Sequence, residues 1–471
     1  RNKELDALNR LYQSDKFEFV VIYGRRRVGK TALINHFIDD KTAIYFMGVE
    51  SNEKQNLENF SKSIIEFSSG IQTETSFASY QAALEYVFKL AENERVILTI
   101  DEYPYVARAS KSLASTLQML IDKYKDRSKL MLILCGSSMS YMEDQVLAYK
   151  APLYGRRTAQ MKIMPFDFEE CCTYLSGLSD EDKAYIYGIV GGTPQYLLQM
   201  DDKLSVEENI KNTYLNPMSF LYEEPLNLLK QEVREPAIYN AIITAVATGH
   251  SRMSEISTKV GESTTVCSGY LKNLIDLGII KKETPYGEKS SRKSIYSIED
   301  NMFYFWYRFV LDNASVIARG AVDIVYKRIE AQLNDYMGRV FEEICTQYLW
   351  KLLIEEKMPI EFTSLGRWSG NDPRKKIQAE IDIMGEQDSN SAIFAECKWR
   401  NENVDLDVLE TLVDRSGLFH YTTIHYFLFS KTGFTKGCME QAEKMRNVTL
   451  VSYEDMISLF STSPVPYQPI M

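Results

Sequence analysis

FEFVVIYGRRRVGKT, residues 17–31, is the stretch that decides the fold of the first part of the chain. The apolar residues 17–23 predict a buried strand, and residues 31–38 predict a helix. Between them, residues 24–31 match the pattern G-x-x-x-x-G-K-[ST], in which backbone N–H groups surround phosphates. Strand, loop and helix occur in the order that a phosphate cradle requires. The sequence therefore predicts a nucleotide-binding site.

Each position of this Walker A loop has an expected role. The Lys30 ammonium is expected to reach the β and γ oxygens and to act in catalysis, and the Thr31 hydroxyl to ligate Mg²⁺. The residues expected to bind the nucleotide here are Gly24, Arg25, Arg26, Arg27, Val28, Gly29, Lys30, Thr31 and Ala32. A glycine-rich turn that binds nothing is the alternative, and the flanking strand and helix argue against it.

Two further apolar runs end in polar residues. Residues 96–100 predict a buried strand that is followed by Asp101 and Glu102. Asp101 is expected to hold Mg²⁺ through water and Glu102 to polarise the attacking water, whereas solvated acids at a strand end are the alternative. Residues 130–134 predict a third buried strand, after which the hydroxyls of Ser137 and Ser138 are expected to sense the γ-phosphate.

Two arginines follow the third strand in the segment LYGRRT, residues 153–158. Arg156 and Arg157 are candidates for an arginine finger, acting in cis or in trans, that neutralises charge in the transition state. Surface arginines that contact no phosphate are the alternative.

Together these segments resemble the archaeal-type ATPases of the STAND branch, which are relatives of AAA+ proteins. The motifs that carry the resemblance are RNKELDAL at 1–8, GRRRVGKT at 24–31, LTIDEYPY at 98–105, LCGSS at 134–138, LYGRRT at 153–158 and GGTPQYL at 191–197. The resemblance implies that the nucleotide is ATP, that Arg1, Glu4 and Leu5 pack near the adenine, and that Gly192 and Pro194 lie in a helical lid. The chain opens at Arg1 without a methionine, so we expect residues to precede it.

Length and composition are those of a multi-domain globular protein. At 471 residues the chain is expected to hold about three domains. No apolar run approaches the roughly 20 residues of a membrane span. Seven cysteines, odd in number and without C-x-x-C, predict reduced thiols in a cytoplasmic protein, and the four histidines lack the spacing of a zinc site. A net charge of −11 excludes long-range attraction to polyanions, so any nucleic-acid contact must be local.

The middle of the chain predicts a winged helix-turn-helix. Helices are expected at 236–247, at 254–260 with Ser254 as the cap, and at 263–277, followed by a β-hairpin over 278–298. The third helix offers Ser263, Thr264, Thr265, Ser268 and Lys272, and the wing offers Lys281, Lys282, Lys289, Arg292 and Lys293. Small hydroxyls and a basic wing suit DNA, whereas a packing or interaction module is the alternative. The aromatic residues 303–309 are expected to lie in the core.

The C-terminal part carries a second group of candidate residues. Alternation along a strand places Glu396 and Lys398 on one face, and a neighbouring strand would bring Asp382 beside them. Two carboxylates can hold Mg²⁺ while a lysine orients water or neutralises charge on phosphorus. The pattern resembles the PD-(D/E)xK nuclease fold, with Glu342 on the preceding helix as an extra ligand. A structural ion pair is the alternative, and Glu380 is a possible substitute for Asp382.

We therefore expect an α/β protein with four segments. These are a P-loop ATPase core at 1–165, a helical lid at 166–232, a winged helix-turn-helix with an aromatic helix at 233–311, and a linker helix with a nuclease-like domain at 312–471. The leading function is an ATP- and Mg²⁺-dependent protein that acts on DNA. The alternative is a STAND-type signalling switch whose C-terminal domain binds DNA or protein without cutting. Self-assembly and a protein partner are both left open.

Overall fold

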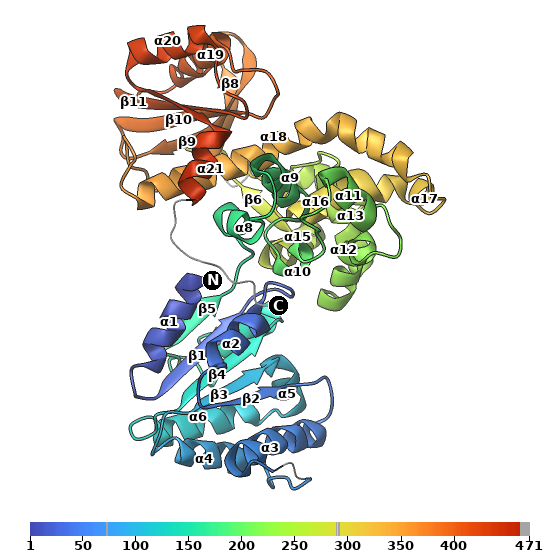
Figure 1. The fold of residues 1–471 in the computed structure, drawn as a ribbon, viewed down its shortest axis with the longest axis vertical. Coiled ribbons are helices and arrows are strands. Elements are labelled where there is room, and N and C mark those ends of the chain that lie inside the picture. Colours follow the sequence, from blue (N-terminus) through green and yellow to red (C-terminus); the bar gives the residue numbers. More distant parts are fainter. Residues whose placement is uncertain (72–73, 289, 291–292, 462–471) are drawn as a thin grey trace. The chain divides into compact units, whose positions relative to one another are not determined.

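The computed structural model describes residues 1–71, 74–288, 290 and 293–461 (Figure 1). The chain divides into two compact units. The first comprises residues 1–165 and 193–195, and the second comprises residues 166–192 and 196–461. The two hydrophobic clusters that flank the N-terminal sheet lie in the first unit, and the largest cluster lies in the second.

The first unit is built on a five-stranded parallel sheet. Its strands are β1 (Glu18–Tyr23), β2 (Ala43–Met47), β3 (Ile97–Asp101), β4 (Met131–Gly136) and β5 (Ala159–Lys162). They are ordered β2-β3-β4-β1-β5, and each neighbouring pair is parallel. β1, β3 and β4 are buried along their whole length, as expected for a parallel sheet covered on both faces. The predicted α/β parallel sheet is confirmed.

Helices cover both faces of this sheet (Figure 1). One face packs on α1 (Asn2–Tyr12) and α2 (Lys30–Ile38). The other packs on α3 (Glu53–Ser69), α4 (Tyr80–Leu90), α5 (Tyr103–Ala109) and α6 (Leu113–Tyr124). A short helix α7 (Met139–Tyr141) and a π-helical turn η1 (Met142–Leu147) follow β4. Because β1, β4 and β3 are adjacent and parallel, the loops that follow them meet at one edge of the sheet.

The second unit begins with a series of helices. They are α8 (Phe168–Tyr174), α9 (Asp180–Val190), α10 (Pro194–Leu197), which begins within the 193–195 segment of the first unit, α11 (Val206–Thr213), α12 (Phe220–Glu232), α13 (Pro236–Ala247), α14 (Met253–Val260) and α15 (Thr264–Asp276). A hairpin of β6 (Ile280–Glu283) and β7 (Ile295–Ile298) follows α15. Then come α16 (Asn301–Phe305), η3 (Trp306–Val310), η4 (Leu311–Asn313), α17 (Ala314–Ile317) and the long helix α18 (Val322–Ile354).

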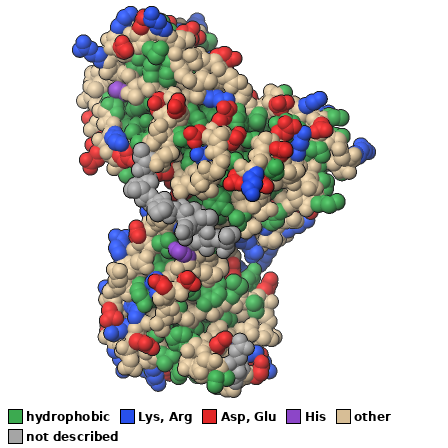
Figure 2. Space-filling view, viewed as in Figure 1, with side chains coloured by type: hydrophobic (Ala, Val, Ile, Leu, Met, Phe, Trp, Pro, Cys, Tyr) green, Lys and Arg blue, Asp and Glu red, His purple; other side chains and the backbone are tan. Residues whose placement is uncertain are grey.

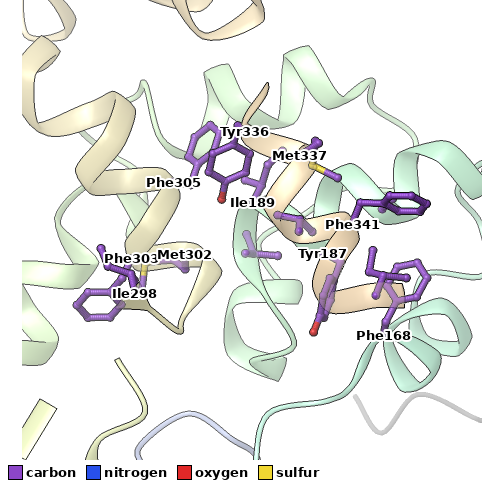
Figure 3. Packing of buried hydrophobic residues seen from close by; sticks show 14 of the residues in the cluster. Phe168, Tyr187, Ile189, Ile298, Met302, Phe303, Phe305, Tyr336, Met337 and Phe341 are labelled. Carbon is purple, nitrogen blue, oxygen red and sulfur yellow. The ribbon is translucent and has the colours of Figure 1, made fainter. Parts of the chain in front are cut away.

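A continuous hydrophobic cluster joins these helices to the sheet that follows them. It extends in sequence from Phe166 to Phe460 and includes the aromatic residues of α16 and η3. Figure 3 shows Phe305 of α16 beside Tyr336 of α18, and their ring centroids are 5.7 Å apart in an edge-to-face arrangement. Met337 and Phe341 continue this face of α18. The aromatic segment is therefore core, because its rings are buried between helices.

The second unit ends in a mixed five-stranded sheet. Its strands are β8 (Gly366–Asp372), β9 (Ile377–Glu386), β10 (Ser391–Lys398), β11 (Thr423–Ser430) and β12 (Val448–Ser452). They are ordered β12-β11-β10-β9-β8, with β8, β9 and β10 antiparallel and β10, β11 and β12 parallel. The helices α19 (Leu406–Ser416), α20 (Lys436–Met445) and α21 (Tyr453–Ser461) are inserted after β10, β11 and β12. β8 is an edge strand.

Several expectations from composition can be compared with this fold. All seven cysteines are buried and free, as expected. Among the described residues, no helix is both long and apolar enough to cross a bilayer. On the face drawn in Figure 2, acidic and basic side chains are intermixed rather than gathered into a basic stripe. The surface seen there is consistent with the expectation that contact with nucleic acid must be local.

Candidate functional site

The loop between β1 and α2 has a conformation that depends on its two glycines. A Cβ at Gly24 would lie 2.4 Å from the backbone oxygen of Ile163, so no side chain fits there. Gly29 has φ 87°, a left-handed conformation that L-residues rarely adopt, and it caps α2. Gly29 therefore places the N-terminal end of α2, where backbone N–H groups favour anions, directly after the loop.

Lys30 lies within this loop and is almost fully buried, with 6% of its surface exposed. Its Nζ donates to the backbone oxygens of Gly24, 2.9 Å away, and Arg25, 2.8 Å away. The ammonium therefore already lies inside the curve of the loop, where the sequence places the β and γ oxygens of a nucleotide. Phosphate oxygens would replace carbonyl oxygens as its acceptors.

Asp101, at the end of β3, is the centre of a hydrogen-bond cluster beside the loop. Its Oδ2 accepts from the Thr31 hydroxyl and from the Tyr45 hydroxyl, each at 2.8 Å, and its Oδ1 accepts from the N–H of Glu102. Burial, and then the charge of Asp101, raise the pKa of the Tyr45 phenol well above its usual range, so the phenol remains a donor. Thr31 and Asp101, which were predicted to hold the same Mg²⁺ ion, therefore lie within hydrogen-bonding distance of each other. Tyr45 also donates to Asp101, and this contact was not predicted from the sequence.

Glu102 is held in position by its backbone and by Ser137. Its φ of 49° is left-handed, an uncommon conformation for glutamate that costs energy and is frequent at functional sites. The Ser137 hydroxyl, after β4, lies 2.9 Å from both carboxylate oxygens of Glu102. Ser138 instead accepts from Arg108 at 3.2 Å. The structure therefore places Ser137, more than Ser138, next to the predicted catalytic glutamate.

The remaining residues of the loop contact neighbouring segments of the first unit. Arg25 donates to the Thr193 hydroxyl, and Arg26 donates to the Tyr105 hydroxyl at 3.1 Å. A Cβ at Gly29 would lie 3.7 Å from Cγ of Pro194, so the predicted proline does lie against the loop. Further loop contacts include a hydrogen bond from Arg1 to the backbone oxygen of Val28, at 2.9 Å, and one from the N–H of Gln195 to the backbone oxygen of Arg27, at 3.4 Å.

The backbone of Arg156 and Arg157 lies at the end of the strands opposite to the phosphate loop. They precede β5, whose first residue pairs with Val20 near the beginning of β1. Arg156 donates through Nε and Nη2 to Asp122, at 2.9 and 2.6 Å, and Arg157 lies over the ring of Tyr154. The phosphate loop follows the other end of β1, so the expectation that Arg156 acts in cis is corrected. Burial, and then Glu143, raise the pKa of the Tyr23 phenol beside the loop while the charge of Arg157 lowers it, so action of Arg157 in cis stays a prediction. Action on a second molecule stays a prediction.

The second candidate site lies where β9 and β10 separate. Their antiparallel pairing ends at Ile383 and Ala395. Just beyond this point, Oδ2 of Asp382 accepts a hydrogen bond of 2.9 Å from the backbone N–H of Cys397. The carboxylate thus replaces the backbone acceptor that β9 would supply if the pairing continued. The carboxylate of Asp382 therefore lies in the fork between the two strands.

A bulge in β9 accompanies this fork. Gly366 of β8 pairs with Met384 of β9, but Trp368 pairs with Ile381, so residues 382 and 383 together oppose Arg367. A bulge of this kind re-aims the side chains of the bulged strand and is common beside active sites. Asp382 is one of the two bulged residues.

Glu396 and Lys398 lie on one face of β10, as the alternation of the strand predicts. Nζ of Lys398 is 2.7 Å from Oε1 of Glu396 and 3.8 Å from Oδ2 of Asp382. Nη1 of Arg415, on α19, is 3.5 Å from Oε2 of Glu396 and donates to the backbone oxygen of Glu380. The structure thus brings the three predicted residues together and adds Arg415, which no local sequence signal indicates.

Glu342, on α18, lies on the other side of this group. Burial, and then the negative charge of Asp382, raise the pKa of the Glu342 carboxyl to about 7. Its nearest cation is Arg367, whose Nη2 is 3.9 Å from Oε1 of Glu342 and whose Nε is 3.0 Å from Oε1 of Glu380. Burial, and then Asp382, also raise the pKa of Glu396. The carboxyl groups of this site therefore repel one another when all are ionised.

A Mg²⁺ ion fits this donor set only in part. Asp382 and Glu396 offer the carboxylate oxygens that Mg²⁺ prefers. Oε2 of Glu396 is buried and receives no hydrogen bond from the described part of the chain, which is unusual for a buried carboxylate unless it binds something else. No group of three or more His, Cys, Asp or Glu among the described residues is arranged around one ion. Glu342 as a further metal ligand stays a prediction.

The helices and hairpin of the middle segment place the predicted DNA-contacting residues at the surface. On α15, Thr264, Thr265, Ser268 and Lys272 are exposed, while Ser263 caps the helix by accepting from the N–H of Val266. The helix α14 is capped at Arg252 rather than at Ser254, because Glu255 accepts from the N–H groups of Ser251 and Arg252.

The basic charge of the hairpin is partly neutralised. Lys281 is paired with Glu283 at 2.7 Å, and Lys293 is paired with Glu288 at 2.5 Å. Lys282 lies over the ring of Tyr296. Lys289 and Arg292 lie outside the described residues. The described part of the hairpin is therefore less basic than its composition suggested, because each lysine pairs with a glutamate of the same hairpin or packs on a ring.

Comparisons with known proteins identify the first unit and give no function for the end of the chain. Residues 1–200 match a family described as an ATPase domain predominantly from Archaea, and residues 306–409 match one described as archaeal and bacterial proteins of unknown function. The chain is 34% identical over 403 residues to the uncharacterized protein MJECL04 of Methanocaldococcus jannaschii, a match that covers 85% of this chain and 87% of that protein.

Two other proteins agree with this assignment. The uncharacterized ATP-binding protein MJ0423 of the same organism is 46% identical over 41 residues, 9% of this chain and 70% of that protein. The Walker-type ATPase PABY2304 of Pyrococcus abyssi has a similar fold, with 19% identity and a TM-score of 0.51 over 65% of this chain and 95% of that chain. The chain therefore belongs to the archaeal-type P-loop ATPases, which bind nucleotide, in one family with the Methanocaldococcus jannaschii protein that it matches over most of its length.

Proposed function

We propose that this ATPase acts on DNA and carries a metal-dependent phosphodiesterase site in its C-terminal part. The observation that carries the proposal is the fork between β9 and β10, where Asp382, Glu396 and Lys398 converge within 3.8 Å of the lysine nitrogen. Two acidic groups and a lysine at a strand fork are the groups that hydrolysis of a phosphodiester needs. The resemblance of these residues to the PD-(D/E)xK sequence pattern supports the same assignment.

Each side chain has a role in this proposal. Asp382 and the orphan Oε2 of Glu396 would hold Mg²⁺, which when bound polarises the phosphoryl oxygen and activates water. Lys398 lies beside both carboxylates, so its ammonium would also lie beside a phosphate bound there. It would then donate to the attacking water or to the phosphate instead of to Glu396. Nη1 of Arg415, 3.5 Å from the same Oε2 of Glu396, offsets part of its charge without donating a hydrogen bond to it. Glu380, which is paired with Arg367, is outside this set.

At the nucleotide site, we propose that Lys30 binds the β- and γ-phosphates of ATP, that Thr31 and Asp101 hold Mg²⁺, and that Glu102 orients the attacking water. The support is their arrangement around one edge of the sheet, with Thr31 already 2.8 Å from Asp101. The Ser137 hydroxyl is 2.9 Å from both carboxylate oxygens of Glu102. This contact would have to break before Glu102 could accept a hydrogen bond from the attacking water.

DNA is the proposed partner of the winged module formed by α13–α15 and the hairpin. The exposed face of α15 presents small hydroxyls and Lys272, and a Cβ at Gly269 would meet nothing within 4 Å. Such a face permits close approach to a groove, and Lys272 can contact phosphate. The boundaries of this module, 233–311, and those of the nuclease-like segment, 312–471, remain proposals as well.

The alternative is a switch in which the C-terminal domain binds without cutting. A specific observation favours it: Lys398 and Arg415 each approach one oxygen of Glu396, as in a structural ion-pair network. The described residues also contain no group of three or more His, Cys, Asp or Glu side chains arranged to hold one ion. In that case the three residues stabilise the sheet, and nucleotide state changes only which surface is presented.

A plasmid nicking assay with Mg²⁺ or Mn²⁺ separates the two functions. The wild type is expected to nick supercoiled DNA, and Asp382→Asn and Lys398→Met to be slower by at least about 100-fold, because each removes a ligand or a charge at the reacting phosphate. Glu410→Gln, which replaces an exposed glutamate of α19, is the control and should cleave normally. Wild-type cleavage by Asp382→Asn, or no cleavage by any form, rejects the nuclease.

A further inference from the structure

The loop of the β6–β7 hairpin contacts the edge of the C-terminal sheet. The N–H of Tyr286 donates to the backbone oxygen of Arg367 on β8, at 2.9 Å. β8 is an edge strand, so this oxygen faces the open side of the sheet, and the hairpin supplies the donor that a neighbouring strand would supply. The tip, residues 284–288, therefore covers an edge that would otherwise be exposed.

The side chain of Tyr286 strengthens this contact. Its hydroxyl accepts from the N–H of Glu386, at the end of β9, at 2.9 Å, and from the Ser364 hydroxyl at 3.4 Å. The ring packs on the cluster that contains Trp368 and Phe394. A Cβ at Gly366 would lie 3.2 Å from Cδ2 of the ring, so the ring rests on the bare backbone of β8. One residue of the hairpin thus joins both strands that flank the bulge.

The residue of β8 that accepts the hydrogen bond from Tyr286 also faces the acidic site. Arg367, whose backbone accepts from Tyr286, directs its guanidinium to Glu380 and toward Glu342, and it opposes Asp382 across the bulge. A shift of β8 would therefore displace the Arg367 guanidinium, a cation that already lies beside the carboxylates of the proposed phosphodiesterase site. The hairpin, in turn, follows directly from α15, and α15 packs against β6.

We propose that the hairpin is an internal latch through which duplex DNA bound at α15 regulates the acidic site at the β9–β10 fork. With the latch closed, Tyr286 fixes β8 and holds Arg367 between Glu342 and Glu380. Duplex DNA at α15 draws the hairpin away from β8, because only three residues separate α15 from β6, so that movement of α15 is passed to the hairpin. Arg367 then leaves the acids, and the site is free to take up a cation. This inference rests on the proposed DNA-directed function and concerns its control.

Hydrogen–deuterium exchange in the full chain tests the latch without any need for cleavage. Tyr286→Ala should speed exchange of β8 and of the amides near Glu386, whereas Tyr286→Phe, which keeps the ring, should speed only the Glu386 amide, by about fivefold. Tyr421→Phe is the matched control, because the Tyr421 hydroxyl donates to the side chain of the same Glu386, at 2.6 Å, and makes no hydrogen bond to the described residues of the hairpin. It should leave the exchange of β8 unchanged.

A short DNA duplex added to the wild type supplies the second readout. Exchange at Tyr286 and Glu386 should accelerate about fivefold with duplex, and Tyr286→Ala should show no further change. Unchanged exchange of β8 in Tyr286→Ala overturns the contact, and unchanged exchange of the wild type with duplex overturns the regulation, whether or not the duplex binds. Absence of plasmid cleavage in the same samples, with the exchange response intact, would sink the nuclease and leave the latch standing.

Discussion

Replacement of Glu342 by glutamine should change how the stability of the second unit depends on pH. The carboxyl of Glu342 keeps its proton to about pH 7 in the folded protein, whereas it releases it near its ordinary value of 4.5 in the unfolded chain. The folded state therefore binds more protons between these values, and stability falls as pH rises from about 4.5 to about 7. Glutamine, which is neutral at every pH, removes this loss.

The magnitude follows from the difference between the two pKa values. A rise from 4.5 to about 7 corresponds, at 1.36 kcal/mol for each pKa unit, to an upper limit of about 3.4 kcal/mol. The side chain of Glu342 is still 25% exposed, so water screens part of this, and we expect about 2 kcal/mol. Below pH 5 the carboxyl is protonated in the folded protein and the variant should resemble the wild type.

Urea unfolding followed by tryptophan fluorescence measures this effect in the relevant unit alone. The four tryptophans, Trp306, Trp350, Trp368 and Trp399, all belong to the second unit. Unfolding free energies of the wild type and Glu342→Gln are compared at pH 5, 6, 7 and 8. Their difference should grow by about 2 kcal/mol in favour of the variant between pH 5 and pH 8.

Glu330→Gln is the control for this measurement, because Glu330 is an exposed glutamate of the same helix. It should follow the wild type at every pH. Parallel pH profiles for Glu342→Gln and the wild type would refute the reasoning, since they would mean that Glu342 ionises alike in both states. A variant that is less stable at every pH by a constant amount would show that packing, and not charge, is the effect.

Three further predictions concern the nucleotide and DNA. Lys30→Ala should weaken ATP binding by at least about 100-fold in calorimetry, because two charge-assisted hydrogen bonds to phosphate are lost, and unchanged affinity would exclude Lys30 from the site. Glu102→Gln should keep ATP affinity but release phosphate at least about 100-fold more slowly, and normal turnover would assign the water to another group. Lys272→Glu should abolish a low-salt gel shift with duplex DNA, whereas Lys203→Glu, an exposed lysine far from α15 in sequence, should not; equal shifts would point to another surface.

The parallel sheet and the groups of its nucleotide edge could be predicted because they are encoded locally. Each apolar run is long enough to identify a buried strand, and each functional group stands directly after one. The order of the strands brings those ends together, with Thr31 reaching Asp101. Tyr45 was missed because it lies in the middle of the edge strand β2, and its contact with Asp101 depends on pairing between strands far apart in sequence.

Residues that act across elements could not be predicted in the same way. Arg415 reaches Glu396 from α19, and Tyr286 reaches β8 from a hairpin that precedes it by 80 residues in the chain. Charge counts also misled: the lysines of the hairpin appeared as a basic wing, but the fold pairs Lys281 and Lys293 with glutamates of the same hairpin. Net charge along a segment does not determine which cations remain available to phosphate.

The bulge in β9 shows how a broken pattern marks the site. Ile381 and Ile383 are two residues apart and should face the same side of the sheet, yet Ile381 belongs to one hydrophobic cluster and Ile383 to another, while Met384 joins Ile381. This reversal requires one extra residue, which the shifted register against β8 supplies at 382 and 383. In the sequence the signal is the apolar pair 383–384, which interrupts the alternation of residues 379–383. Asp382 is turned into the fork because the strand is bent there, so the bulge itself positions the predicted ligand.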